Sequence, residues 1–282
     1  MQKTSLSSSL TLSGDAALHA IQAQARYLFR PAEFGRLTGN EAGGAALKSA
    51  LSRFSKRKRI TLASKRPAAW LIVPPEHQHY GAPPVGWWLD EYMKESEPHY
   101  YLALLSAARH WGSGHYALQT TQIMVSAQRA QQTIGLLRLD FTFKRHIEKT
   151  PVVLVSTAVA RMRVSTREAT LLDLIRHQPE IGGLEAVARV AKDLAPALTA
   201  KCLIEAMDAL DQTRSAQRLG FIFEQLSLVE LAATAEAWLK PRRITSQPLE
   251  PDTGINAGER TVSHRWGITY VPSQIEVFAE IA

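Results

Sequence analysis

The sequence predicts an α+β fold in two domains, and three observations support that prediction. Residues 15–56 place apolar side chains three and four positions apart, as amphipathic helices do, and two short β-prone runs follow them. Residues 74–98 contain five of the fourteen prolines, a composition typical of a domain boundary. After them come further β-prone runs and then a long helical stretch. We expect a flexible arm at 1–13, a first domain at 14–80 and a second domain at 85–282.

Three helices should open the first domain. The apolar stripe of the first helix consists of Leu18, Ile21, Ala25 and Leu28. The second helix should begin at Pro31, because proline suits a first helical turn, and end at Gly39. Asn40 is a suitable N-cap for the third helix, which would bury Leu47 and Leu51.

Two β-prone runs follow the third helix, at residues 59–62 and 69–73, with a polar turn at 63–67 between them. Three helices followed by a β-hairpin predict a winged helix-turn-helix. In that fold the third helix enters the major groove of DNA, and the hairpin, called the wing, lies along the DNA backbone.

All of the net positive charge lies within residues 53–66 of this domain. The chain carries 33 Lys and Arg against 26 Asp and Glu, a balance of +7. The seven basic residues of this stretch, which contains no acid, are Arg53, Lys56, Arg57, Lys58, Arg59, Lys65 and Arg66. At the end of the third helix and on the wing they would bind DNA phosphates. The alternative is a run of charge on a solvated helix end.

Base reading would fall to the exposed side of the third helix, because side chains there can reach the floor of the major groove. The residues expected to form this recognition surface are Asn40, Glu41, Gly43, Gly44, Lys48, Ser49 and Ser52.

The second domain is expected to be a mixed α/β effector domain with a helical C-terminal half. Its predicted helices cover residues 99–112, 164–177, 181–190, 196–212, 215–226 and 229–239. Its predicted strands cover residues 122–126, 136–143, 151–155 and 160–164, with one returning strand at 266–271.

Several classes of function lack their sequence signals. The chain has no P-loop, no Gly-x-Ser-x-Gly nucleophile elbow and no convincing metal-ligand spacing, so we expect no enzyme activity, no cofactor and no metal. No apolar run is long enough to span a membrane, and the N-terminus does not read as a secretory signal. The single cysteine, Cys202, excludes an intramolecular disulfide and fits a cytoplasmic protein.

Four charged residues form a candidate effector-domain site: Glu168, Asp173, Arg214 and Arg218. A structural explanation is available for the two acids. Glu168 would complete a capping box with Ser165, and Asp173 would pair with Arg176 one turn later. A catalytic pair would instead need a raised carboxyl pKa in a cleft.

Three stretches of the second domain carry a family resemblance. VSTREATLLDLIRH at 164–177, IGGLEAVARV at 181–190 and RLGFIFEQL at 218–226 resemble, in this order and spacing, the AbiEi family. PLEP at 248–251 and RWGI at 265–268 resemble the C-terminal segment of that family. AbiEi proteins are antitoxins of abortive-infection systems, which are type IV toxin–antitoxin pairs.

The resemblance implies a DNA-binding autorepressor that recognises inverted repeats in its own promoter, with two copies on the DNA. It also implies that the second domain counteracts a co-encoded nucleotidyltransferase-like toxin, commonly without a stable direct complex. Two alternatives stay open: a direct protein inhibitor of the toxin, and an enzyme in the second domain that acts on RNA or nucleotides.

Overall fold

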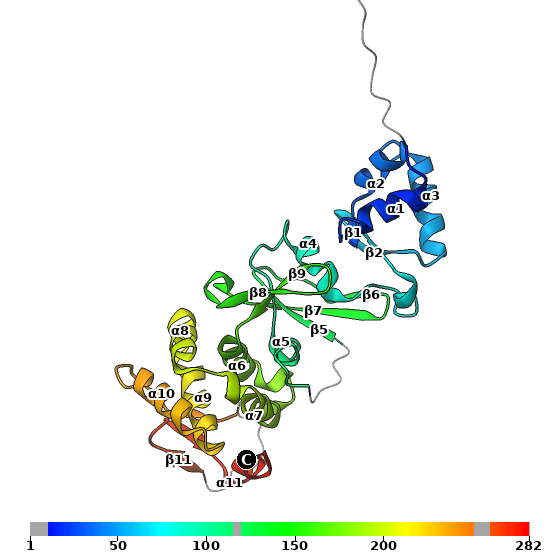
Figure 1. Ribbon diagram of the computed structural model, residues 1–282. Coiled ribbons are helices and arrows are strands. Elements are labelled where there is room, and N and C mark those ends of the chain that lie inside the picture. Colours follow the sequence, from blue (N-terminus) through cyan, green and yellow to red (C-terminus); the bar gives the residue numbers. More distant parts are fainter. Residues whose placement is uncertain (1–10, 115–119, 251–259, 282) are drawn as a thin grey trace, which may run out of the picture. The chain divides into compact units, whose positions relative to one another are not determined.

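The computed structural model describes residues 11–114, 120–250 and 260–281, which form a mixed α+β structure (Figure 1). The described chain divides into two compact units. Unit 1 holds the residues up to Pro98 together with Gln131–Arg138 and Val155–Met162, and unit 2 holds the rest. The α+β class is confirmed. Most of the expected arm lies outside the described residues, and the domain limits at 80 and 85 stay predictions.

Unit 1 begins with two helices and a short strand. Helix α1 (Gly14–Gln22) is capped by Ser13, whose Oγ accepts the N–H of Ala16 at 3.2 Å, and α2 (Pro31–Thr38) ends at Gly39 with φ +69°. Leu28 was expected to continue the stripe of the first helix, and that expectation was wrong. It lies in strand β1 (Leu28–Phe29), because the chain leaves the helix after Gln22.

Helix α3 (Ala45–Lys56) starts four residues later than the sequence pattern indicated. Gly44 occupies the N-cap position, and Gly43 has φ +84°, a left-handed conformation that glycine adopts without a steric penalty. Asn40 is therefore not the cap. Its side-chain amide donates to Thr38 Oγ1 at 2.8 Å instead. The pair Gly43-Gly44 disfavours helix by about 1 kcal/mol per residue, so the helix begins just beyond it.

A three-stranded sheet completes this part of unit 1, with strand order β1-β3-β2. Strands β2 (Ile60–Lys65) and β3 (Ala68–Ile72) form an antiparallel hairpin whose turn contains Arg66 and Pro67, and β1 pairs antiparallel with β3. The sheet and the three helices share one apolar core, which consists of Ala17, Leu18, Ile21, Phe29, Phe34, Leu47, Leu51, Ile60 and Ile72. Amphipathic elements of this size bury their apolar faces only against one another.

The proline-rich segment is packed into unit 1 by polar contacts. It contains α4 (Leu89–Met93) after two short 3-10 turns, η1 (Pro75–His77) and η2 (Val85–Trp87). Trp88 is fully buried and donates its indole N–H to the Pro83 carbonyl at 3.1 Å. The guanidinium of Arg26 binds Glu91 at 2.6 Å and also Glu33, so α4 is anchored to the chain segment that precedes β1.

A second sheet has six strands in the order β6-β7-β5-β4-β9-β8. The strands are β4 (Tyr101–Leu102), β5 (Thr120–Val125), β6 (Gln132–Ile134), β7 (Leu137–Phe143), β8 (Val152–Ser156) and β9 (Arg161–Ser165). The helix expected over 99–112 was wrong in its first part, since Tyr101 and Leu102 pair with Met124 and Ile123 of β5. Helix α5 (Leu104–His110) follows only after this strand.

Helices dominate the part of unit 2 that follows β9, as the sequence predicted. In addition to α5, the helices of unit 2 are α6 (Arg167–Arg176), α7 (Gly183–Leu194), α8 (Ala200–Leu210), α9 (Thr213–Gln225), α10 (Val229–Leu239) and α11 (Pro272–Ile281). A small sheet joins β10 (Gln247–Pro248), β12 (Ile268–Tyr270) and β11 (Thr261–Ser263) in that order. Thr166, and not Ser165, caps α6, since its Oγ1 accepts the N–H of Ala169. No helix within the described ranges has both the length and the apolarity to cross a membrane.

Two of the family-like stretches pack directly on each other. Gln217 on α9 donates through Nε2 to the carbonyls of Trp266 at 2.8 Å and Thr245 at 3.0 Å. The indole N–H of Trp266 donates to Glu224 Oε2 at 2.7 Å. Gly220 lies between these contacts, and a Cβ atom at this position would overlap the Trp266 ring. Glycine therefore permits the close approach of α9 to the indole.

Gly220→Ala is accordingly expected to lower the free energy of unfolding by about 2–3 kcal/mol, because the added methyl group forces the buried indole to move. Denaturation in urea, followed by circular dichroism, measures the change. Gly114→Ala is the matched control, since its Cβ would meet open space. Equal stability of the two variants would contradict the expectation.

Candidate functional site

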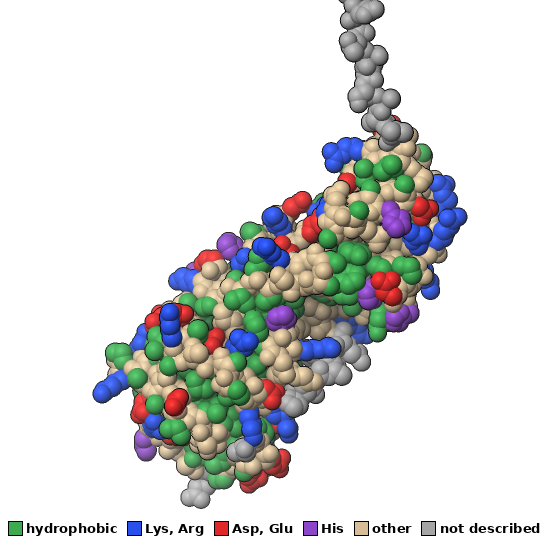
Figure 2. All heavy atoms as spheres, in the orientation of Figure 1, with side chains coloured by type: hydrophobic (Ala, Val, Ile, Leu, Met, Phe, Trp, Pro, Cys, Tyr) green, Lys and Arg blue, Asp and Glu red, His purple; other side chains and the backbone are tan. Residues whose placement is uncertain are grey.

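The basic residues of 53–66 lie on one surface of unit 1, at the end of α3 and on the β2–β3 hairpin. Arg53, Lys56, Arg57 and Lys58 are exposed at and just beyond the last turn of α3, and Lys65 and Arg66 are exposed at the hairpin turn. Figure 2 shows Lys and Arg side chains gathered over the part of unit 1 that Figure 1 labels α3. Six cations with access to solvent give this surface a strong positive potential.

Arg59 differs from the other six basic residues. It is half-buried, and its guanidinium pairs with Asp15 at 3.2 Å. Across the described ranges, the remaining six have no ion-pair partner. Their charges are available to an external anion, while that of Arg59 is partly compensated. We name these six residues the basic surface: Arg53, Lys56, Arg57, Lys58, Lys65 and Arg66.

The recognition residues predicted from the sequence fall into two groups. Lys48, Ser49 and Ser52 are exposed on α3, on the side opposite the buried Leu47 and Leu51. The other four, Asn40, Glu41, Gly43 and Gly44, lie in the segment between α2 and α3. The structure thus retains three of the seven on the helix and moves four to the turn before it.

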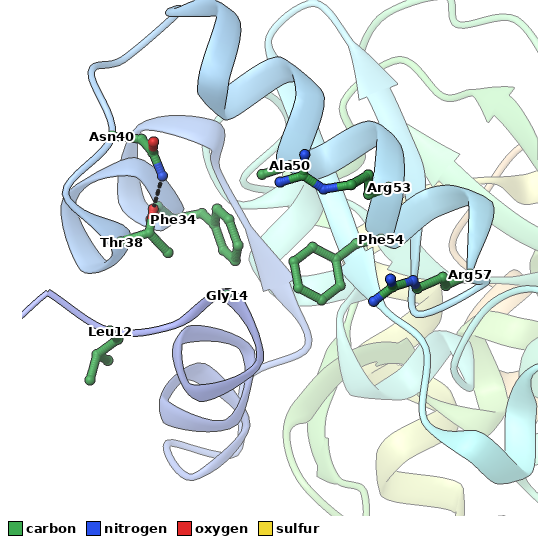
Figure 3. Close-up of a pocket in the computed structure, with 9 residues that line it drawn as sticks. All are labelled: Leu12, Gly14, Phe34, Thr38, Asn40, Ala50, Arg53, Phe54 and Arg57. Carbon is green, nitrogen blue, oxygen red and sulfur yellow. Dashed lines mark hydrogen bonds between the residues drawn. The ribbon is translucent and has the colours of Figure 1, made fainter.

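A hollow of about 310 Å³ opens beside the second half of α3 (Figure 3). Arg53 and Arg57, one helical turn apart, contribute to its lining together with Gly14 at the start of α1 and Asn40. Two arginine side chains therefore line the same hollow, an arrangement that suits a phosphate group.

In unit 2, Asp173 is fully buried and belongs to a polar cluster. Lys144 Nζ donates to Asp173 Oδ1 at 2.5 Å and to the Tyr101 hydroxyl at 2.9 Å, and that hydroxyl donates to Asp173 Oδ2 at 2.7 Å. The expected pairing of Asp173 with Arg176 is wrong, because Lys144 reaches the carboxylate from the end of β7. We call Tyr101, Lys144 and Asp173 the buried triad.

Burial determines the protonation chemistry of this triad. It raises the pKa of Tyr101 well above its usual value, with the Asp173 carboxylate acting in the same direction. Burial also lowers the pKa of Lys144, although the attraction of Asp173 opposes this effect. Both carboxylate oxygens of Asp173 accept hydrogen bonds, so the triad is a closed network of satisfied groups.

The four residues of the candidate effector-domain site are not joined into one constellation. Glu168 is buried in the first turn of α6, while Arg214 is exposed on α9. Arg218 donates through Nε to the Pro248 carbonyl at 3.1 Å, and burial lowers its pKa, as does the neighbouring Arg214. No hydrogen bond or ion pair between described residues links either acid to either arginine.

Sequence reasoning missed Tyr101 and Lys144, although one signal indicated that Asp173 needs a buried partner. Asp173 stands within the apolar run LLDLI, on a helix whose surrounding residues are all buried. A carboxylate in that position requires a cationic partner from another element. Which cation supplies it is not encoded locally, because Lys144 lies 29 residues away in the chain. The described residues hold no group of three or more His, Cys, Asp or Glu side chains fit to bind a metal ion.

Comparison with known families gives one match, which lies mostly in unit 2. Residues 101–225 match the model of the AbiEi antitoxin C-terminal domain. This stretch is similar to the AbiEi antitoxin domain. This assignment confirms the resemblance seen in the sequence, and it supports the role of an antitoxin in a toxin–antitoxin system. All three members of the buried triad lie inside the matched residues.

Solved structures support the fold. The chain is similar to the crystal structure of the RV2827C protein from Mycobacterium tuberculosis, with a TM-score of 0.63 and 13% sequence identity. The similarity covers 96% of this chain and 95% of that one. At such identity the likeness concerns the fold alone. Comparison with curated proteins gave no match.

Proposed function

We propose that this protein is a DNA-binding autorepressor and antitoxin of the AbiEi family, with a winged helix-turn-helix in unit 1. The basic surface is the observation that carries the DNA-binding part. Its six cations lack ion-pair partners among the described residues, and they occupy the end of α3 and the turn of the adjoining hairpin. In a winged helix-turn-helix these are the positions of the recognition helix and the wing.

Two groups of residues would contact different parts of the DNA, according to their chemistry and position. Long cations at the end of α3 and on the hairpin would contact phosphates, which gives affinity with little sequence information. The short side chains Ser49 and Ser52, with Lys48, would face base edges in the major groove. Inverted repeats in the promoter of its own operon would bind two copies.

The antitoxin part of the proposal rests on the family match of residues 101–225. We propose that unit 2 counteracts a co-encoded nucleotidyltransferase-like toxin without catalysis of its own. The buried triad supports this view, since every hydrogen-bonding atom of the Asp173 carboxylate already has a partner. A catalytic carboxylate would need an oxygen directed at a substrate.

Ser49→Ala with Ser52→Ala is expected to reduce the preference for operator DNA over a scrambled duplex by about ten-fold, because base contacts contribute about 1–3 kcal/mol each. Fluorescence anisotropy with both duplexes measures this ratio. Affinity for the scrambled duplex should stay unchanged, since neither substitution alters charge. Arg53→Gln with Arg57→Gln provides the contrast, because this variant should bind both duplexes more weakly and to the same extent. An unchanged preference in the serine variant would contradict the assignment of α3 as the recognition helix.

Growth rescue separates the two proposed activities. The full chain with Arg53→Gln, Arg57→Gln, Lys65→Gln and Arg66→Gln should lose repression of a promoter reporter while still neutralising the toxin encoded beside it. Loss of both activities in this variant, with its fold intact by circular dichroism, would show that neutralisation requires DNA binding. Co-purification of a stable complex with the toxin would favour direct inhibition instead.

A further inference from the structure

Unit 2 contains a hollow of about 490 Å³ that the proposed functions do not use. It lies where the end of β7, the 3-10 turn η3 (Ile147–Lys149), the end of α6 and the turn between α8 and α9 come together. Small-molecule sites in proteins span about 300–1,000 Å³, so the hollow has the size of such a site.

Positive charge dominates the lining of this hollow. Lys144, Arg145, Lys149 and Arg176 contribute to it, against one acid, Asp211. The charge of Lys144 is compensated by its ion pair with the buried Asp173. The side chains of Arg145, Lys149 and Arg176 are exposed, and within the described part of the chain no acid pairs with them. Three cations without an ion-pair partner among the described residues therefore line one cavity, against the single carboxylate of Asp211.

Arg176 increases this excess of positive charge. Its charge lies close enough to Lys144 to contribute to the lowered pKa of that amine, which reports repulsion between the two cations. His146 also contributes to the lining, and its Nδ1 lies 3.6 Å from Glu148 Oε1. An anion in the hollow would relieve this repulsion.

An aromatic side chain completes the lining. Phe143, the last residue of β7, lines the hollow and is 47% exposed, whereas Phe141, two residues earlier in the strand, is 9% exposed. An exposed aromatic ring beside clustered cations is the combination with which proteins stack bases and bind phosphates. We propose that the hollow binds a free nucleotide, with Phe143 stacked on its base and Arg145, Lys149 and Arg176 in contact with its phosphate groups.

The clustering of charge favours a nucleoside di- or triphosphate over a nucleic-acid strand. A strand carries one charge per nucleotide and is held by a basic groove that follows its backbone. Here three free cations converge on one cavity, which matches the charge concentrated on a polyphosphate. Because every aromatic ring can stack on every base, the site should accept purines and pyrimidines.

Isothermal titration of the full chain with ATP and with CTP, in magnesium-free buffer, tests this proposal. Arg145→Gln with Lys149→Gln should weaken binding of both nucleotides by about ten-fold or more, since hydrogen bonds to charged groups are strong. The matched control is Lys201→Gln with Lys240→Gln, which removes two exposed charges elsewhere in unit 2. This control should bind like the wild type.

A separate substitution tests the role of Phe143. Phe143→Ala should weaken the binding of ATP by about five-fold or more and leave the binding of tripolyphosphate unchanged, because only the nucleotide has a base to stack. The proposal is overturned if ATP binds no more tightly than tripolyphosphate to the wild type, or if the pocket variant and its control bind alike. It is also overturned if a short single-stranded oligonucleotide without a terminal phosphate displaces ATP at equal concentration, since a strand would then be the preferred ligand.

Discussion

Lys144→Met is expected to lower the free energy of unfolding by about 3–5 kcal/mol, because it leaves a buried charge without its partner. Asp173 is 0% exposed, and Lys144 is the cation that binds its carboxylate. With methionine in place, the carboxylate keeps the hydrogen bond from Tyr101 but loses its counter-ion. Urea denaturation followed by circular dichroism gives the difference in unfolding free energy.

The matched control is Lys149→Met, which replaces an exposed lysine on the same stretch of chain. It should change stability by no more than about 0.5 kcal/mol. The double variant Lys144→Met with Asp173→Leu should recover much of the loss, because an apolar pair of similar volume removes the uncompensated charge. If Lys144→Met and Lys149→Met unfolded at the same urea concentration, the buried triad would have no structural importance.

Binding of duplex DNA is expected to fall steeply with salt, in proportion to the phosphates that the basic surface contacts. Six contacts per protein correspond to a slope near −5 in a plot of log affinity against log salt concentration, and to a loss of roughly a thousand-fold between about 50 and 200 mM salt. Arg53→Gln, Arg57→Gln, Lys65→Gln and Arg66→Gln together should flatten that slope by about 3.6. Anisotropy titrations at several salt concentrations measure it.

The control removes four exposed charges outside the basic surface: Lys94, Lys201, Lys240 and Arg243, each replaced by glutamine. Both variants have the same net charge, so a difference between them reports position and not overall electrostatics. A slope that flattens equally in the two variants would place the DNA elsewhere on the protein. Arg59 is kept in both, because Asp15 already compensates its charge.

Local sequence signals predicted most of the helices. Periodic apolar residues indicated five helices between residues 164 and 239, and the structure confirms them as α6–α10. The pattern failed where pairing between distant segments overrode it. Tyr101 and Leu102 look like part of a helical stripe, yet they form β4 because β5 and β9 supply hydrogen-bonding partners on both sides.

The candidate sites also differ in whether the sequence alone could predict them. The basic surface was evident in the sequence, since its residues are neighbours in the chain and solvent exposure requires no particular partner. The start of α3 was misplaced, because a good capping residue at Asn40 competes with two glycines that disfavour helix. The hollow that carries the nucleotide proposal was not visible, since β7, α6 and the α8–α9 turn supply its lining from separate parts of the chain.

By itself the sequence determined where the net charge lies, where the helices of residues 164–239 lie and which family the second part resembles. These properties depend on residues close together in the chain, or on their order along it. Only the tertiary structure decided that Asp173 pairs with Lys144, that Gly220 makes room for Trp266 and that three unpaired cations surround one cavity. Each of these arises when distant segments share a buried or enclosed space, where charge and volume must be matched.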